Sequence, residues 1–254
     1  MTRMKRHISI ALLSLLVACS LPVRATNLTD RLHFSATLGY NLGGTAPIGL
    51  PATIRHLNSY TPQFTPAIGF RALLPLQGNW GVQTGVIIEN KAMKEDAQVK
   101  NYHMEITRGG ETLAGMFTGD VLTRVYQWCV TIPVTVTYTV GKVNLKAGPY
   151  LSRVLTNDFS GYAHNGYLRV DDPTGPKVTL GEAPNERGDY DFDEHMRHWF
   201  VGVVVGADWT LSRHFGLFAD LNWGLNAVMK SDFHTIEQNL YPIYGTLGVT
   251  YRLR

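Results

Sequence analysis

Cysteine is almost absent from the 254-residue sequence, which contains only Cys19 and Cys129. A chain with so few thiols has no internal disulfide framework and no cysteine-based metal cluster. Long apolar runs are also missing. The only run of helical character, residues 8–18, is shorter than the ~20 residues that a membrane-spanning helix needs. The sequence therefore excludes a helical membrane protein and a disulfide-stapled scaffold.

The short apolar run has the features of a secretory signal peptide, because the basic residues Arg3, Lys5 and Arg6 precede it. We favour cleavage after Ala25, which has small residues at the −1 and −3 positions and gives a signal peptide 1–25 and a mature domain 26–254. The segment 16–19 also resembles a lipoprotein signal, so lipidation at Cys19 is the alternative.

Removing residues 1–25 changes the charge of the chain. The whole sequence has 23 basic and 20 acidic residues, and four basic residues lie in the signal segment. The mature chain therefore has 23 − 4 = 19 basic residues against 20 acidic ones, a net charge of −1. This balance gives no reason to expect nucleic acid as a partner.

Strict alternation of apolar and polar residues is the main pattern of the mature chain. In the segment 126–140 every even position is apolar, and Thr takes most of the odd positions. Gly141-Lys142 then forms a two-residue turn. Period-two alternation predicts a β-strand with one apolar face, and Gly first is typical of a type II′ hairpin turn. The apolar face continues across the turn into the segment 143–152.

The same alternation predicts eight strands in all. They cover residues 32–42, 64–76, 80–89, 126–140, 143–152, 199–211, 215–225 and 243–253. Short turns (77–79, 141–142 and 212–214) alternate with long connections (43–62, 90–124, 156–197 and 227–240). Each short turn keeps the apolar face in phase, so that Leu76 opposes Trp80 and Leu211 opposes Phe215.

This pattern favours a transmembrane up-and-down antiparallel β-barrel of eight strands, with its apolar face in contact with outer-membrane lipid. The apolar faces are about ten residues long, the length that a tilted strand needs to cross a bilayer. Aromatic residues lie near the strand ends, as interfacial girdles do. Only closure satisfies all backbone groups in lipid. We expect a bacterial outer-membrane protein, delivered by the outer-membrane assembly machinery, with both termini and the short turns in the periplasm.

Residues 97–122 leave the strand number open. They could form a further hairpin that makes the barrel ten-stranded, or they could extend the third and fourth strands beyond the membrane. The segment lacks a clean apolar face of membrane length. We therefore favour the extension and an eight-stranded barrel.

Six charged side chains are predicted to face the barrel interior: Arg71, Glu89, Lys146, Asp208, Asp220 and Arg252. Eight strands leave a lumen that side chains can fill. Buried charges are tolerated when they are paired. We expect an ion-paired plug that closes the lumen; the alternative is a narrow gated path for small solutes.

Three loop segments contain residue types that could bind metal or catalyse a reaction. Asp189–Glu194 is acidic but lacks the spacing of an EF-hand loop, and His195 and His198 have no third ligand at a set spacing. Ser231, Asp232 and His234 lie too close in sequence to supply the geometry of a catalytic triad. We expect no catalytic residue, cofactor or metal site.

The chain resembles the PorT-like small outer-membrane β-barrel family of Bacteroidetes-type bacteria. The resemblance rests on Ile132-Pro133, on Gly141 followed by residues 147–150, and on the closing strand that ends in YRLR. These segments mark architecture and carry no chemistry. The resemblance implies a barrel without a general activity, and one branch of the family is associated with protein secretion across the outer membrane.

We therefore expect a non-enzymatic barrel whose long surface loops bind another envelope or secreted protein, in a role that could be accessory to protein secretion. A narrow gated pore is the first alternative. An outer-membrane lipid-modifying enzyme is the second.

Overall fold

The computed structural model describes residues 31–49, 52–233, 235 and 239–253. The chain divides into two compact units, Met1–Leu32 and His33–Arg254. The predicted signal peptide 1–25 and Cys19 lie outside the described residues. The second unit is built from antiparallel strands, with a short 3₁₀ helix, η1 (Asp193–His195). No helix among the described residues has the length and apolar character needed to cross a membrane.

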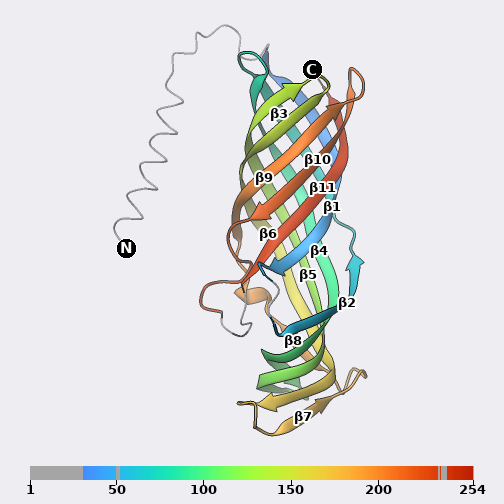
Figure 1. Cartoon of the computed structure of the whole chain (residues 1–254), viewed down its shortest axis with the longest axis vertical. Helices are drawn as coiled ribbons and strands as arrows, with labels where there is room; N and C mark the ends of the chain where they lie inside the picture. The colour runs from blue at the N-terminus through green and yellow to red at the C-terminus, as the bar shows by residue number, and fades with distance from the viewer. Residues whose placement is uncertain (1–30, 50–51, 234, 236–238, 254) are drawn as a thin grey trace, which may run out of the picture. The chain divides into compact units, whose positions relative to one another are not determined.

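Eight strands form a closed ring, in the order β4-β3-β1-β11-β10-β9-β6-β5, and β5 pairs again with β4. The predicted eight-stranded antiparallel barrel is confirmed (Figure 1). Its strands are β1 (His33–Pro47), β3 (Pro66–Pro75), β4 (Trp80–Arg108), β5 (Glu111–Val140), β6 (Val143–Val170), β9 (Trp199–Thr210), β10 (Phe215–Gly224) and β11 (Leu240–Arg252).

The three short turns have the predicted pairing. Val140 lies opposite Val143, and Gly141 has a φ of +59°, a value that glycine adopts without the steric cost of a side chain. The amide of Leu76 donates to the carbonyl of Trp80 at 2.8 Å, and the amide of Leu211 donates to that of Phe215 at 3.0 Å. The apolar faces of adjacent strands therefore stay in phase around the barrel.

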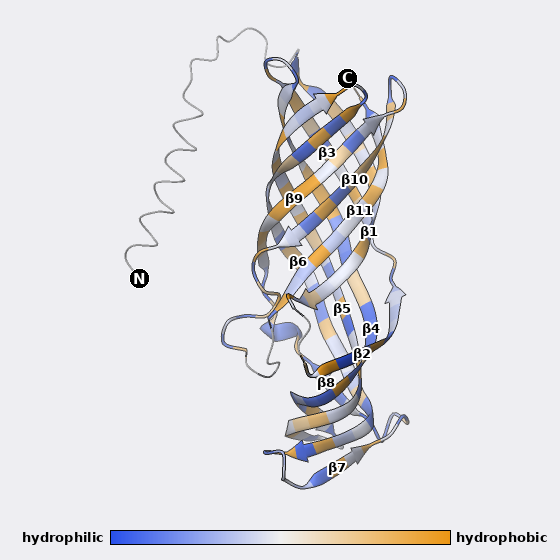
Figure 2. Cartoon of the chain, viewed as in Figure 1, coloured by the Kyte–Doolittle hydropathy of each residue, from blue (hydrophilic) through white to orange (hydrophobic). Residues whose placement is uncertain are grey.

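Large apolar side chains cover the outside of the barrel. Val136, Val205 and Val249 are each about half exposed in the isolated chain, and Figure 2 shows apolar and polar residues alternating along the strands. Aromatic residues lie at both ends of this surface. Those near the short turns are Trp80, Tyr138, Trp209, Phe215 and Tyr251, and those near the long connections include Tyr126, Trp199 and Trp223. This arrangement is typical of a barrel that spans a membrane.

β4, β5 and β6 continue well past the barrel and form an extension (residues 93–125 and 156–192, with β2). Three further strands pair with them: β2 (Ile54–Pro62) with β4, β7 (Lys177–Leu180) with β6, and β8 (Gly188–Asp191) with β6 and, at one position, β4. The predicted extension of the third and fourth strands is confirmed, since residues 97–122 add no strand to the ring. The segment 156–197, expected to be a long connection, instead contributes strand to the extension.

The extension has an apolar interior of its own. The buried cluster includes Val99, Met104 and Ile106 from β4, with Phe117 and Val121 from β5. Phe159, Ala163 and Leu168 from β6, Tyr190 from β8 and the adjacent Phe192 complete its walls. The polarity of the inward face therefore reverses along these strands, from polar in the barrel to apolar in the extension.

Bulges in β4 and β6 explain how these strands keep their apolar residues inward in the extension. Val99 and Tyr102 pair with Gly119 and Phe117, so β4 has one residue more than β5 at this point, and Asn101 there has a φ of 56°. In β6, similar irregularities lie at Leu155 and at Asn165, which has a φ of 49°. A bulge inserts an unpaired residue and changes which sequence positions face inward.

Candidate functional site

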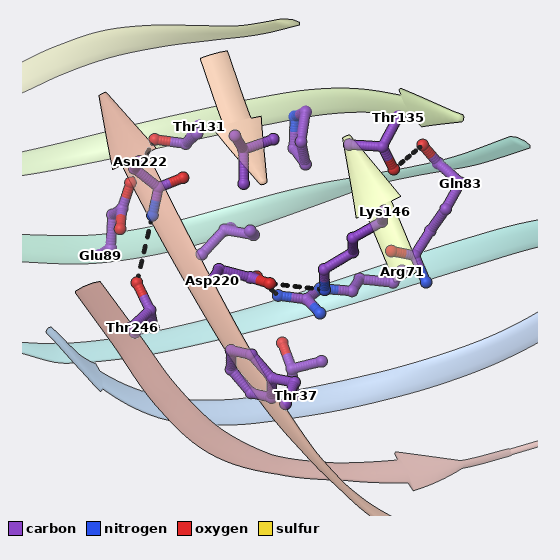
Figure 3. Close-up of a pocket in the computed structure, with 15 residues that line it drawn as sticks. Thr37, Arg71, Gln83, Glu89, Thr131, Thr135, Lys146, Asp220, Asn222 and Thr246 are labelled. Carbon is purple, nitrogen blue, oxygen red and sulfur yellow. Dashed lines mark hydrogen bonds and ion pairs between the residues drawn. The ribbon is translucent and has the colours of Figure 1, made fainter. Parts of the chain in front are cut away.

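The barrel lumen holds the densest group of charged side chains. Arg71 projects from β3, Lys146 from β6, Asp208 from β9 and Asp220 from β10. Arg71 lies 3.2 Å from Asp208 and 2.8 Å from Asp220, and Lys146 lies 2.7 and 2.8 Å from the same carboxylates. The two cations and two anions therefore form a closed four-membered network across the lumen (Figure 3 shows three of its members).

Small and aromatic residues make room for this network. A Cβ on Gly206 would lie 2.1 Å from the Asp220 carboxylate and 3.0 Å from the Lys146 side chain. The Phe218 ring lies 4.3 Å from the Arg71 guanidinium carbon and 5.5 Å from the Lys146 amine. The ring offers both cations a favourable cation–π contact in addition to their ion pairs.

A second polar group lies further toward the extension. Lys91 pairs with Glu89 at 2.9 Å, and Glu89 also accepts hydrogen bonds from Thr131 at 2.5 Å and from Asn41 at 3.1 Å. The Lys91 amine lies 5.4 Å from the centre of the Tyr150 ring. Glu89 thus belongs to a group separate from the four-membered network.

The middle of the lumen has almost no free space. The cavity between the two polar groups has a volume of about 20 Å³ and is lined by residues that include Arg71, Glu89, Lys146 and Asp220 (Figure 3). A volume of ~10–15 Å³ is the least that holds one water molecule. Between the two polar groups the side chains therefore fill the lumen and leave room for about one water.

Arg252 keeps the predicted inward phase, but it lies at the mouth of the lumen and not in its interior. It is exposed near the end of β11, opposite Ser35, and lines a small depression at the short-turn end of the barrel. It is the last residue of its strand, where the polar face meets solvent, so strand phase alone does not bury it. Cys129 is buried and belongs to the apolar cluster at the junction of barrel and extension.

Two lumen residues could have been found from strand phase. Phe218 occupies the inward phase of β10 between Gly216 and Asp220. Lys91 continues the inward phase of β4 two residues beyond Glu89, at a position assigned to a long connection. In each case the residue lies two positions from another inward-facing residue of the same strand.

Two of the loop segments with possible chemistry lie side by side, since the Lys230 amide donates to the His195 carbonyl at 2.8 Å. Among the described residues, no group of three or more His, Cys, Asp or Glu side chains could hold a metal ion. His195 lies at the end of η1 with its ring 4.9 Å from that of Phe233. His234 lies outside the described residues.

The sequence of residues 23–230 matches the family model described as outer membrane protein beta-barrel domain. The chain belongs to this outer-membrane β-barrel family. The membership agrees with the closed ring and its apolar exterior, and it assigns the protein to the bacterial outer membrane. No curated protein matches the sequence.

Several solved structures are similar to the chain at low identity. Ail, the attachment invasion locus protein of Yersinia pestis, is 11% identical, with a TM-score of 0.38 and coverage of 88% of this chain and 99% of Ail. The translocator domain of the autotransporter NalP from Neisseria meningitidis is 11% identical, with a TM-score of 0.24 and coverage of 97% of this chain and 96% of the NalP domain. The toluene transporter TbuX of Ralstonia pickettii is 8% identical, with a TM-score of 0.22 and coverage of 88% of this chain and 90% of TbuX.

Proposed function

We propose that this outer-membrane β-barrel is a non-conducting, non-enzymatic anchor that presents its extension to another envelope or secreted protein. The observation that carries the proposal is the contrast between a filled lumen and a separately packed extension. Strands that only close a barrel have no need of a second apolar core. A folded module fixed to a membrane anchor is suited to binding.

The filled lumen argues against a pore. Four ion pairs cross it, and the cavity of about 20 Å³ beside them has room for about one water. Further along, the lumen ends against the buried side chains of Met93 and Val125. A solute would have to break the ion pairs and then cross an apolar barrier.

The edge of β2 supports a role in binding. β2 pairs with β4 along one side and ends the sheet order on the other. Leu57 and Tyr60 are exposed on it, at 51% and 39%. An exposed edge strand offers unpaired backbone groups to a partner chain.

The orientation belongs to the same proposal. Short turns of outer-membrane barrels lie in the periplasm, so the termini would be periplasmic and the extension would lie outside the cell. The resemblance to PorT-like barrels adds a role accessory to protein secretion as one use of such a surface. A lipid-modifying activity would require a catalytic group, and an unchanged lipid A mass spectrum on overexpression is the expected result.

Site-specific photo-cross-linking in cells tests the proposal. A benzophenone side chain at Ser59, on the exposed β2 strand, is expected to yield a discrete protein adduct. The same probe at Lys142, in a short turn of the barrel, is the matched control and is expected not to yield that adduct. Absence of any adduct from Ser59 would contradict the binding role.

Single-channel recording in planar bilayers tests the closed lumen. The purified barrel is expected to show no stepwise conductance. Regular conductance steps that change in Arg71→Ala would support the pore instead.

A further inference from the structure

The interior of the extension contains a second cavity, separate from the lumen. Its volume is about 70 Å³, and most of its walls are apolar side chains, among them Val99, Met104, Val121, Phe159 and Phe192. Pro47, Ile54 and Leu240 also line it and are only half-buried, so the cavity reaches the surface beside the ends of β1, β2 and β11.

Glu95 is the one charged residue that lines this cavity. It shares the inward face of β4 with Ala97 and Val99, because alternate residues of a strand point to the same side. Among the residues that the structure describes, the Glu95 carboxyl has no hydrogen-bond or ion-pair partner. A carboxyl in apolar surroundings without a partner is unfavourable and is commonly a binding group.

The neighbouring Tyr190 and Thr123 hydroxyls form their hydrogen bonds elsewhere. The Tyr190 hydroxyl lies 2.8 Å from Thr123 Oγ1 and donates to the Leu122 carbonyl at 3.0 Å. The cations Lys94 and Arg124 pair with each other in the sheet register, one step from Glu95 and Thr123, and so lie on the opposite face. Among the described residues that line the cavity, none is a cation.

The size and the single carboxylate define the ligand. A cavity of ~150 Å³ accepts benzene, so a volume of about 70 Å³ suits a short alkyl chain better than a ring. A guanidinium brings five donors in a rigid fork, whereas an ammonium is a compact charge on an apolar stem. One carboxylate at the edge of an apolar cavity complements an ammonium on an alkyl stem.

We propose that this cavity binds a primary ammonium group carried on a short alkyl chain, with Glu95 as its counter-ion. A free alkylamine and a lysine side chain of a partner share this chemistry. The lysine source rests on the binding role proposed above, while the site itself does not.

The protonation of Glu95 gives the site a pH signature. Burial raises the pKa of Glu95 to about 7. The other titratable groups around the cavity are Tyr102 and Tyr190, and burial raises the pKa of Tyr190 further. Asp96, on the adjacent face, is held by Asn58 and by His164, both at 3.2 Å. A ligand that requires the Glu95 carboxylate should bind about tenfold more weakly at pH 6 than at pH 8.

The test uses the full protein in detergent micelles with its methionine methyl groups labelled with ¹³C. Addition of n-butylammonium chloride at pH 8 is expected to shift the Met104 methyl resonance saturably, with the tenfold weakening at pH 6. Glu95→Gln should weaken binding at least tenfold and remove the pH dependence. Glu111→Gln, at the exposed tip of the β4–β5 hairpin, is the matched control and should leave binding unchanged.

A second variant tests the cavity without changing its charge. Ala97→Leu places additional volume at the cavity wall, and it should abolish binding although Glu95 is retained. The proposal is overturned if n-butylammonium leaves Met104 unaffected, if 1-butanol shifts it equally, or if binding persists in Glu95→Gln.

Competition by short peptides distinguishes the two sources. Displacement of n-butylammonium by a peptide with a central lysine, and not by its norleucine analogue, supports the site with a partner lysine as ligand. Binding of n-butylammonium without competition supports the site and assigns it to free alkylamines. A missing cross-link from Ser59 would contradict the partner role while leaving this result intact.

Discussion

The barrel and the extension share three strands, β4, β5 and β6, and the polarity of their inward faces is opposite. Along β4 the inward positions change from Gln83, Glu89 and Lys91 in the barrel to Val99 and Met104 in the extension. The exterior changes in the opposite sense. The difference follows from the medium, because lipid requires an apolar exterior and water requires an apolar interior. A single strand can therefore satisfy both when its residue pattern reverses at the membrane boundary.

Deletion of Thr123 is expected to have the largest effect, because it disrupts the inward phase of β5 in the extension but not in the barrel. β5 keeps one phase from Phe117 through Val121 to Cys129, and a one-residue deletion moves every residue on one side of it to the other face. Moving Phe117 and Val121 out of the apolar interior should lower the free energy of unfolding of the extension by more than about 5 kcal/mol. Limited proteolysis would show its loss, while heat-modifiable migration on gels reports the barrel.

Deletion of Asn101 is the matched control for that experiment. Asn101 is an extra residue in the β4 bulge, so its removal leaves Tyr102 and Met104 facing inward. Protease resistance should persist. Equal damage from both deletions would contradict the assignment of the bulge.

Arg71→Ala should destabilise the barrel by about 3–5 kcal/mol, because it leaves Asp220 buried without one of its two cationic partners. Urea unfolding in lipid vesicles measures the loss. Arg252→Ala, at the exposed strand end, should change stability by less than ~0.5 kcal/mol. Equal effects of the two substitutions would mean that the lumen network does not stabilise the fold.

Glu95→Gln should have a smaller effect, confined to the extension and dependent on pH. Burial raises the pKa of Glu95 from 4.5 to about 7. The folded state therefore binds the proton more tightly than the unfolded state, and stability falls as pH rises from about 4.5 to 7. The variant should lack this fall and be more stable at pH 8 by about 2 kcal/mol. Hydrogen exchange of β4 and β5 amides at pH 5 and pH 8 measures it, and an equal change at both values would contradict the prediction.

The sequence predicted the barrel well because its strands keep a strict two-residue period and meet at short turns. It predicted the extension only as a favoured alternative. In β6 the inward residues change from even to odd positions at Leu155 and back at Asn165, and bulges of this kind leave no periodic signal. The pairing of Arg71 with Asp208 and Asp220 was also out of reach, since it depends on the register with which the barrel closes.

Spin-label accessibility along one strand tests the central claim most directly. In a protein with Cys19 and Cys129 replaced by Ala, nitroxide labels at Val136→Cys and Glu111→Cys report the barrel exterior and the extension tip of β5, both exposed in the isolated chain. In lipid vesicles, we predict that molecular oxygen relaxes the label at residue 136 more than a polar nickel complex does, with the reverse at residue 111. The same preference at both positions would contradict a strand that passes from lipid into water.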